Sequence, residues 1–446
     1  MSFPRYPVYK DSGVEWLGEM PEQWEMIQLK RIGSIRYGIG EPPEYVDEGT
    51  RLIRATNVRA GNLSDAGMVY VNPADIPPQR ILWLEGGDIV IVRSSAYTGD
   101  SAIIPLGYGP CIAGFDMVLK IHASRPNYVQ YALLGAYVKD YQIELKRMRA
   151  AQPHLNAEEL GGCLFLMPPP TEQSAIVNFL DHETAKIDAL IAEQQRLIEL
   201  LQEKRQAVIS HAVTKGLNSD APMKDSGVEW LGEVPAHWEV AALNYRYEVL
   251  LGKMLDDKQI SGDHLQPYLR NTDVQWDKIN VEDLPAMDFE ESEYDRYGLK
   301  PGDLLVCEGG EVGRSAIWIG KLEMCFYQKA LHRLRPRSQF RDHPRFQYLL
   351  MRMATATDIF SSASGKATIA HLTAESLRKH RFAYPPLDEQ VKIAKFLDKM
   401  TSRLQLLIEA ATTAISLLQE RRSALISAAV TGQMDVRGFA PEAVAT

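Results

Sequence analysis

Two long stretches of the chain place apolar residues at every seventh position. In the first stretch, one row of such positions holds Leu180, Ile187, Gln194, Leu201 and Val208, and a second row holds Leu190 and Leu197. In the second stretch, the corresponding rows hold Leu397, Leu404, Ala411, Leu418 and Leu425, and Leu407 and Ala414. Heptad spacing is typical of helices that pack along a seam. The pattern predicts two long helices, each with an apolar stripe that needs a partner.

The residues between these apolar positions support the helical prediction. No Gly or Pro occurs from Glu172 to Lys215, and Ala, Leu, Glu, Gln and Lys are frequent there. Thr171 is the expected N-cap. A run of ~40 residues spans ~60 Å, which is longer than one domain covers. We therefore expect the two helices to pair as an antiparallel coiled coil about an internal two-fold axis. The alternative, two amphipathic helices that each pack only on their own domain, is disfavoured by their length.

The chain contains an internal repeat. Residues 10–25 (KDSGVEWLGEMPEQWE) match residues 224–239 (KDSGVEWLGEVPAHWE) at 13 of 16 positions. Residues 172–214 match residues 389–431 at 21 of 43 positions. A repeat of this kind indicates one supersecondary frame used twice.

The two inserts carried by this frame, residues 26–167 and 240–384, resemble each other only faintly. Each contains a short apolar run entered by Gly-Asp, at Ile89–Val92 and at Leu304–Cys307, which reads as a buried strand leading into a loop. The sequence predicts the α/β fold class, with two globular α/β domains separated by two long helices. The expected boundaries are 1–170 for the first domain, 171–217 for the first helix, 218–387 for the second domain, 388–433 for the second helix and 434–446 for a tail.

Polar segments near these strands are candidates for contact with DNA. Arg suits guanine, Asn or Gln suits adenine, and Glu suits cytosine, and loops on rigid strands are common binding positions. Turn formation would explain the glycines of the same loops equally well. The candidate DNA-binding residues are Arg54, Thr56, Asn57, Arg59, Arg93, Ser94, Ser95, Tyr97, Arg149, Gln152, Arg270, Asn271, Asp273, Glu308, Arg314, Gln328, Lys329 and Lys366.

Composition and charge narrow the class of protein. The chain has 446 residues, of which 45% are hydrophobic and 24% charged, so it is not a disordered protein. Its formal net charge of −9 argues against a protein that coats nucleic acid through its overall charge. No apolar run is long enough for a membrane span and the N-terminal residues lack the apolar core of a secretory signal, so we expect a cytoplasmic protein. The four cysteines lie far apart and are expected to be buried thiols.

Motifs of several enzyme classes are absent from the sequence. The chain has no G-x-x-x-x-G-K-[ST] phosphate loop, no G-x-S-x-G elbow and no His-Glu-x-x-His pair. It also lacks the Asp/Asn-Pro-Pro-Tyr/Phe motif of amino-methyltransferases. We therefore expect no catalytic residues and no metal site in this chain.

The repeated blocks resemble those of the specificity (S) subunits of type I restriction-modification systems. The resemblance rests on KDSGVEWLGE-P-x-x-W before each insert, and on P-P-x-x-EQ-x-x-I-x-x-FLD followed by a long helix ending in LLQE-[KR]-R-x-A-[VL]-IS-x-A-VT. It covers nearly the whole chain.

The resemblance implies a non-catalytic subunit with two target recognition domains, each of which reads one half of a split DNA sequence. It further implies that the paired helices set the spacer and hold two methylase (M) subunits, which a restriction (R) subunit joins. S-adenosylmethionine, ATP and Mg are expected on those partners, with no cofactor on this chain. The candidate partner-binding residues, which could equally form plain solvated surface, are Glu172, Gln173, Glu199, Glu203, Arg205, Glu389, Gln390, Glu420 and Arg422.

Two other classes remain open at the level of sequence. One is a structural adaptor whose helices organise a complex and whose globular ends bind protein. The other is an enzyme with an unrecognised active site. Neither explains why the polar loops of the two inserts differ while the frame around them repeats.

Overall fold

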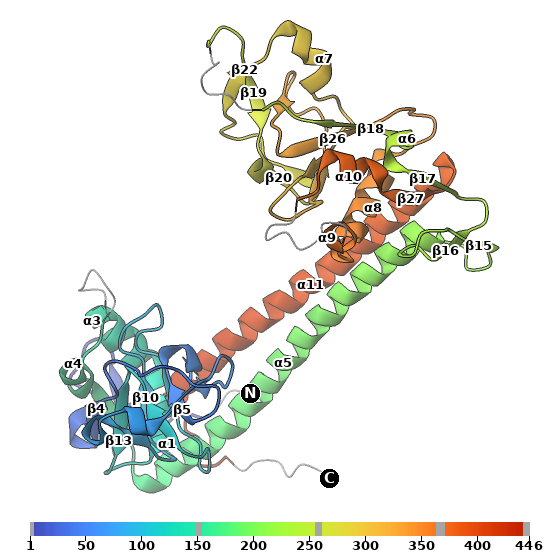
Figure 1. Ribbon diagram of the computed structural model, residues 1–446. Helices are drawn as coiled ribbons and strands as arrows, with labels where there is room; N and C mark the ends of the chain where they lie inside the picture. The colour runs from blue at the N-terminus through green and yellow to red at the C-terminus, as the bar shows by residue number, and fades with distance from the viewer. Residues whose placement is uncertain (1–3, 148–153, 255–260, 363–370, 440–446) are drawn as a thin grey trace. The chain divides into compact units, whose positions relative to one another are not determined.

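The computed structural model describes residues 4–147, 154–254, 261–362 and 371–439 (Figure 1). The chain forms two compact units. Unit 1 combines residues 1–195 with residues 412–446, and unit 2 comprises residues 196–411. Each unit therefore contains one insert together with part of both long helices. This division cuts through the helices, whereas the sequence-based boundaries treat each helix as a separate segment.

Both predicted long helices are present, as α5 (Pro170–Lys215) and α11 (Leu387–Val430). The predicted N-cap, Thr171, is wrong. The Pro169 carbonyl accepts the N–H groups of Glu172 and Gln173, each at 2.9 Å, so helix α5 begins before Thr171. Pro170 takes the first helical position, where a missing N–H leaves no hydrogen bond unmade.

Parts of the two helices pack together within each unit. In unit 1, Phe179 from the start of α5 shares a core with Ile426 from the end of α11. In unit 2, Ile209 from the end of α5 shares a core with Ile393 from the start of α11. Early residues of one helix thus lie beside late residues of the other, so the paired parts are antiparallel within each unit.

The two predicted heptad rows differ in burial. The first row includes residues that are 8% exposed or less: Leu180, Ile187, Leu201, Leu397 and Leu404. The second row is mostly outward-facing, because Leu190, Leu197 and Leu407 are 41–47% exposed. The prediction that these three leucines belong to a buried seam is wrong. They leave an apolar stripe on the outer face of the helices.

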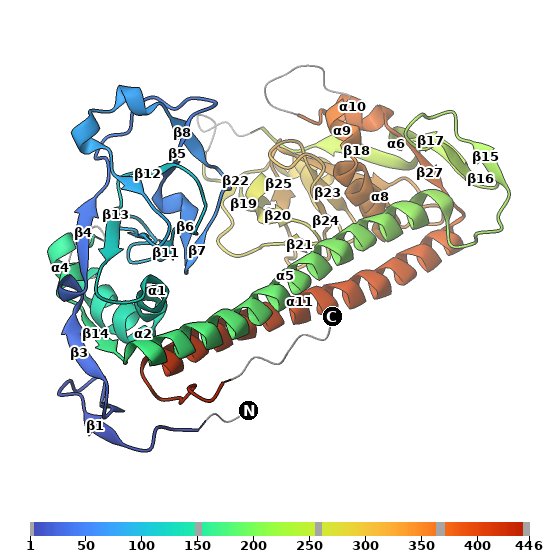
Figure 2. The same cartoon turned by 90° about the horizontal axis from the view of Figure 1, so that it is seen from below.

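The two inserts share one topology. Each has a four-stranded antiparallel sheet, in the order β11-β10-β13-β4 in unit 1 and β24-β23-β26-β18 in unit 2. Each also has a second sheet with one parallel pair, β5 with β12 or β19 with β25. The predicted buried strands are β10 and β23, whose residues are all buried. Figure 2 shows the strands of unit 1 from a second side.

The strands of unit 1 are β1 (Tyr9–Asp11), β2 (Glu19–Pro21), β3 (Glu25–Gln28), β4 (Gly33–Tyr37), β5 (Thr50–Ile53), β6 (Val58–Arg59), β7 (Asn62–Leu63), β8 (Val69–Val71), β9 (Trp83–Leu84), β10 (Ile89–Ile91), β11 (Ser101–Ile103), β12 (Cys111–Ala113), β13 (Met117–Ile121) and β14 (Leu164–Met167). Its shorter α-helices are α1 (Pro126–Leu134), α2 (Ala136–Val138), α3 (Leu145–Arg147) and α4 (Ala157–Gly161).

The strands of unit 2 are β15 (Met223–Asp225), β16 (Glu233–Pro235), β17 (Glu239–Ala242), β18 (Tyr247–Leu251), β19 (Leu265–Leu269), β20 (Val274–Gln275), β21 (Lys278–Ile279), β22 (Ala286–Asp288), β23 (Leu304–Cys307), β24 (Ser315–Ile317), β25 (Phe326–Tyr327), β26 (Leu331–Pro336) and β27 (Arg381–Tyr384). Its shorter α-helices are α6 (Leu243–Arg246), α7 (Tyr294–Tyr297), α8 (Pro344–Ala356), α9 (Ile359–Ser362) and α10 (Ala374–Lys379).

The four cysteines, Cys111, Cys163, Cys307 and Cys325, are free and buried, as predicted. Burial raises the pKa of each thiol, so all four are held in the neutral form. Within the described ranges, no helix combines the length and the apolar character that a membrane span requires.

The repeated N-terminal block is tied to the start of α5 by a buried carboxylate. Glu172, which is 4% exposed, accepts hydrogen bonds from Tyr6 Oη, from Trp24 Nε1 at 3.0 Å and from Gln23 Nε2 at 2.8 Å. In unit 2, Glu389 accepts from Trp238 Nε1 at 3.2 Å and contacts His237 Nε2 at 2.8 Å. Trp24 and Trp238 therefore dock each repeated block on the start of the long helix that follows the insert.

Replacing Glu172 with Ala should destabilise unit 1 by about 2–4 kcal/mol, because buried donors lose a charged acceptor. Urea denaturation followed by circular dichroism measures this loss. Glu389→Ala is the matched control. The Glu389 side chain is 24% exposed, so water can replace its hydrogen bonds and the loss should be about half as large. Equal losses in the two variants would contradict the assignment of Glu172 as the more deeply buried anchor.

Candidate nucleic-acid interface

The segment Arg54–Arg59 forms a short turn whose polar side chains have different environments. Asn57 is fully buried: its Oδ1 accepts the Arg54 N–H at 3.2 Å and its Nδ2 donates to the Ser64 carbonyl at 3.0 Å. Burial contradicts the predicted DNA contact for Asn57, whose amide instead fixes the turn. Thr56 and Arg59 are exposed, and Arg54 is half-buried with its Nη2 donating to the Gly67 carbonyl at 2.7 Å.

The loop after β10 lies against this turn. The Arg59 guanidinium stacks on the Tyr97 ring at 3.4 Å, which brings together the two segments that the sequence predicts separately. Arg93 packs between the rings of Tyr37 and Phe115, at 4.6 and 4.1 Å. Ser94 and Ser95 are half-buried, and Ser95 Oγ accepts the Tyr97 N–H at 2.9 Å. Unit 1 thus presents arginines stacked on aromatic rings, a combination suited to phosphates and base edges.

The buried carboxyl group of Asp116 contacts the backbone of Arg93. Asp116 is 2% exposed, and its Oδ1 accepts the Arg93 backbone N–H at 3.1 Å. Burial raises the pKa of Asp116 to about 6, although the Arg93 N–H and guanidinium act in the opposite direction. The carboxyl group therefore fixes the start of the loop.

Unit 2 has the same two segments with different functional groups. Asp273 is buried and accepts from Arg270 Nε at 2.9 Å and Nη2 at 2.8 Å, which contradicts the predicted DNA contact for Asp273. Asn271 Nδ2 donates to the Gly309 carbonyl at 2.9 Å, and Arg314 Nη2 donates to the Asn271 carbonyl at 3.1 Å. Both segments are therefore joined here as in unit 1.

Glu308 follows β23 at the position that Arg93 holds after β10. The carbonyls of Glu308 and Arg93 accept the N–H groups of Leu372 and Leu155, at 2.8 and 2.9 Å. Equivalent backbone positions thus carry a carboxylate in one unit and a guanidinium in the other. Gln328 is half-buried and Lys329 exposed, whereas Arg149, Gln152 and Lys366 lie outside the described residues.

Comparisons with known proteins agree with this architecture. Residues 238–415 match the family model described as the type I restriction modification DNA specificity domain. The EcoKI specificity subunit of Escherichia coli K12 is 25% identical over 304 residues, which is 65% of this chain and 62% of that subunit. The putative MjaX specificity subunit of Methanocaldococcus jannaschii is 23% identical over 437 residues, which is 94% of this chain and 96% of that subunit. This chain is thus similar to type I specificity subunits over most of its length.

Solved structures show the same fold. A chain from a study of complex assembly and conformational transition of the type I R-M system has a TM-score of 0.66 and 16% identity, covering 93% of this chain and 99% of that chain. The HsdS subunit from Thermoanaerobacter tengcongensis has a TM-score of 0.50 and 16% identity, covering 93% and 98%. The resemblance stated from sequence motifs is therefore confirmed, and the adaptor alternative gains no support.

Several candidate partner-binding residues of this chain make internal contacts instead. Glu172 and Gln173 are 4% exposed and Gln390 is fully buried, which contradicts their predicted role in partner contact. Gln173 Oε1 accepts the Arg125 N–H at 3.2 Å, and Gln390 Oε1 accepts the His343 N–H at 2.9 Å, so both cap the entry to a helix of the insert.

The remaining candidate partner-binding residues of the helices differ in exposure and in their contacts within the chain. Glu199, Glu203 and Glu420 are exposed. Arg205 donates to Gln405 at 3.2 Å, and Arg422 binds Asp188 at 3.0 Å. Glu389 is half-buried against Trp238 and His237.

Sequence reasoning missed the aromatic components of the unit 1 surface. Tyr37 and Phe115, which sandwich Arg93, are each 45% exposed, and Tyr45, which lies 5.5 Å from the Arg54 guanidinium, is 50% exposed. Only Tyr97 was among the candidates. Exposed aromatic residues near predicted basic loops would have been the signal, since stacking platforms are common in nucleic-acid recognition.

A buried histidine holds the Glu308 segment and makes unit 2 sensitive to acid. His332 is fully buried, and its Nε2 lies 2.6 Å from the carbonyl of Leu372, whose N–H donates to the Glu308 carbonyl. Burial lowers the pKa of His332 from 6.5 to about 4. The unfolded chain therefore takes up a proton more readily than the folded one between these values.

Unit 2 should lose stability as the pH falls from about 6.5 to about 4, by up to about 3 kcal/mol in total and by about 2 kcal/mol at pH 5. Above pH 6.5 this contribution is complete. Urea midpoints at pH 7.5 and pH 5 measure the effect, and His332→Gln should reduce the pH dependence by that amount. An unchanged pH dependence in the variant would show that other groups cause it.

Proposed function

We propose that this chain is a cytoplasmic, sequence-specific DNA-binding specificity subunit of a type I restriction-modification complex, and that each unit reads one half of a two-part DNA target. The observation that carries the proposal is the paired construction of the two units. One topology presents Arg93 on aromatic rings in unit 1, and Glu308 with Asn271 and Arg314 in unit 2. Different hydrogen-bonding groups at equivalent positions favour two different half-sites.

The long helices suit the role of a spacer. Their paired parts are antiparallel within each unit, which supports a continuous antiparallel coiled coil that would fix the gap between half-sites. Their outer apolar stripe, with Leu190, Leu197 and Leu407 at 41–47% exposure, supports docking of two methylase subunits there, followed by restriction subunits. The exposed carboxylates of Glu199, Glu203 and Glu420 would form the polar rim of such an interface.

This chain is proposed to be non-catalytic. S-adenosylmethionine, ATP and Mg would be bound by the methylase and restriction subunits, which would carry out methylation, translocation and cleavage. The net charge of −9 agrees with a complex in which partners supply much of the basic surface that faces the duplex.

Mapping of modified adenines tests the proposal. The chain is co-expressed with its methylase subunit in a host free of adenine methylation, and the genome is read by single-molecule sequencing. We expect a split motif with two different halves and a fixed gap. A soluble complex that has an active methylase but gives no sequence-specific methylation would overturn the proposal.

The contribution of the loops is tested in the same assay. Arg93→Ala should relax the sequence specificity at the half-site read by unit 1. A good bidentate hydrogen-bonded contact between a side chain and a base contributes about 1–3 kcal/mol of discrimination. Glu308→Ala should relax only the other half-site. If either variant altered both halves equally, the assignment of one half-site to each unit would be wrong.

A further inference from the structure

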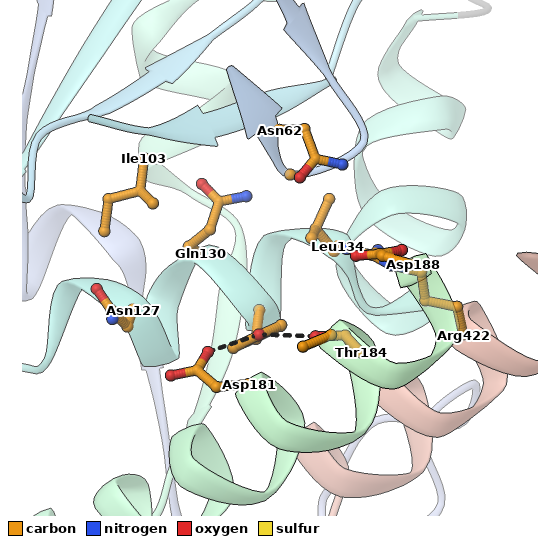
Figure 3. A pocket seen from close by; sticks show the side chains of 12 residues that line it. Asn62, Ile103, Asn127, Gln130, Leu134, Asp181, Thr184, Asp188 and Arg422 are labelled. Atoms are coloured by element: carbon orange, nitrogen blue, oxygen red, sulfur yellow. Dashed lines mark hydrogen bonds and ion pairs between the residues drawn. The ribbon is translucent and has the colours of Figure 1, made fainter. Parts of the chain in front are cut away.

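Unit 1 contains a polar cavity on the side of α5, away from the loops described above. Its volume is about 230 Å³, and it is bounded by the β6–β7 turn, β11, α1 and the paired parts of α5 and α11 (Figure 3). This volume lies below the roughly 300–1,000 Å³ of pockets that hold whole small-molecule ligands. The cavity is therefore sized for a single side chain.

Acceptor groups dominate the cavity. The Asp181 carboxylate accepts a hydrogen bond from the Tyr131 hydroxyl at 2.7 Å. Burial raises the pKa of Tyr131, so the phenol stays protonated and remains a donor. Asp188 is already paired with Arg422 at 3.0 Å, whereas Asp181 has no ion pair with any residue that the structure describes. Gln130 also lines the cavity and is 4% exposed. Its Nε2 donates to Ser101 Oγ at 3.0 Å, and its carboxamide oxygen meets no hydrogen-bond donor within the described part of the chain. A donor group with positive charge would complement this set.

The internal repeat shows which group binds the equivalent carboxylate in unit 2. Asp398 of α11 is the repeat equivalent of Asp181 at the offset of 217, and Arg345 is the second residue of α8, as Asn127 is of α1. The Arg345 guanidinium binds Asp398, with its Nη2 2.8 Å and its Nε 2.9 Å from Oδ1. It also binds Asp277 in the β20–β21 turn and lies 4.5 Å from the ring of Tyr348, the equivalent of Gln130. Unit 2 therefore has a guanidinium at the second position of this helix, bound to the repeated carboxylate, whereas unit 1 has Asn127 there.

The turn in unit 1 has room for such a group. Gly61 occupies the position of Asp277, because its N–H bonds the Ser101 carbonyl at 2.9 Å as that of Asp277 bonds the Ser315 carbonyl at 3.2 Å. Asn127 stands where Arg345 stands, and its side chain is too short to span from α1 to both the turn and α5. In unit 1, smaller residues thus replace Arg345 and Asp277 of unit 2, while the carboxylate of Asp398 is retained as that of Asp181.

We propose that the cavity of unit 1 receives the guanidinium group of an arginine side chain from a partner protein, with Asp181 as its main counter-ion. This inference goes beyond the proposed function and does not depend on DNA recognition, because none of the residues involved belongs to the loops after β10 or β23. Unit 2 has its own arginine at the equivalent position, so the partner is recognised asymmetrically by the two otherwise similar units.

Binding of a blocked peptide to the full chain tests the proposal. The probe is acetyl-Gly-Arg-Gly-amide, and the control is the same peptide with citrulline, which has the shape of arginine without its charge. Isothermal titration calorimetry should show at least tenfold tighter binding of the arginine peptide. Equal binding of the two peptides would overturn the proposal whatever the variants do.

Three variants locate the site. Asp181→Asn should weaken binding of the arginine peptide at least tenfold, whereas Asp398→Asn, the matched change in unit 2, should leave it unchanged. Asn127→Arg should fill the cavity from within, abolish binding and leave the melting temperature unchanged or higher. Equal weakening by the two Asp variants, or full binding by Asn127→Arg, would place the peptide elsewhere and overturn the proposal.

The source of the guanidinium is tested with free arginine. A side chain of a partner protein presents only its guanidinium to the cavity, so the blocked peptide should bind at least as tightly as free arginine. If free arginine bound tenfold more tightly than the peptide, the site would recognise a small molecule and the partner assignment would be wrong.

Discussion

A chimera in which residues 26–167 replace residues 240–384 should methylate an inverted repeat of the half-site read by unit 1. The two inserts enter and leave the frame at equivalent strands in the same register. Met167 pairs with Glu25 where β14 meets β3, and Tyr384 pairs with Glu239 where β27 meets β17. The exchange therefore joins backbone positions that already have matching geometry.

The grafted insert should also find equivalent hydrogen-bond partners on the long helix. The capping bond from Gln173 to the Arg125 N–H has its equivalent in the bond from Gln390 to the His343 N–H. Asp398 would lose Arg345 but meet the grafted Tyr131, which donates to Asp181 in unit 1. Asp398 is 43% exposed, so water can also solvate its carboxylate and the chimera should remain folded.

Mapping of modified adenines measures the outcome, and the reciprocal chimera, in which residues 240–384 replace residues 26–167, is the matched control. It should yield an inverted repeat of the other half-site. Under the proposed function each unit reads its own half, so the change in the sequence recognised should be complete rather than gradual. An unchanged asymmetric motif in a folded chimera would show that the inserts do not carry specificity.

Local patterns were sufficient to predict the frame. The heptad rows around Leu180 and Leu397 identified both long helices, since periodicity and the absence of Gly and Pro are properties of neighbouring residues. The apolar runs after Gly87-Asp88 and Gly302-Asp303 identified β10 and β23 for the same reason. These elements are determined by short-range sequence and need no knowledge of tertiary contacts.

The candidate sites depended on long-range contacts and were predicted less well. Asn57 and Asp273 have the side chains expected of base-reading residues, yet each caps its own turn and is buried. Glu172 belongs to a conspicuous motif, but its function depends on Trp24, which is 148 positions away in the sequence. A polar residue in a loop can therefore either contact DNA or stabilise the turn, and only its tertiary contacts show which role it has.

The outward leucines show a limit of the heptad argument. A seven-residue period identifies which residues share a helix face but not which of two adjacent apolar rows meets the neighbouring helix. Leu201 and Leu404 are buried, whereas Leu197 and Leu407 lie on the open side. That choice depends on tertiary packing, which periodicity does not describe.

A four-residue insertion after Gln194 in α5, matched by one after its repeat equivalent Ala411 in α11, should lengthen the gap between half-sites by one or two base pairs. Four helical residues add about 6 Å and about 40° of rotation. One base pair adds about 3.4 Å and roughly 35°, so the added rotation is close to that of one base pair and the added length is closer to that of two. Both insertions leave the loops after β10 and β23 intact, so the two half-sites should stay unchanged.

The same four residues inserted after Asn218, beyond the end of α5 and exposed to solvent, provide the matched control. That insertion lengthens no helix and should leave the gap as it is. An insertion in α5 alone should shift the helices out of register, because Asp188–Arg422 and Arg205–Gln405 pair them on both sides of the insertion, and should lower methylation severely. If the doubly extended variant is folded and recognises the original gap, the helices do not set the spacing and the DNA path between the units must be determined by the partner subunits.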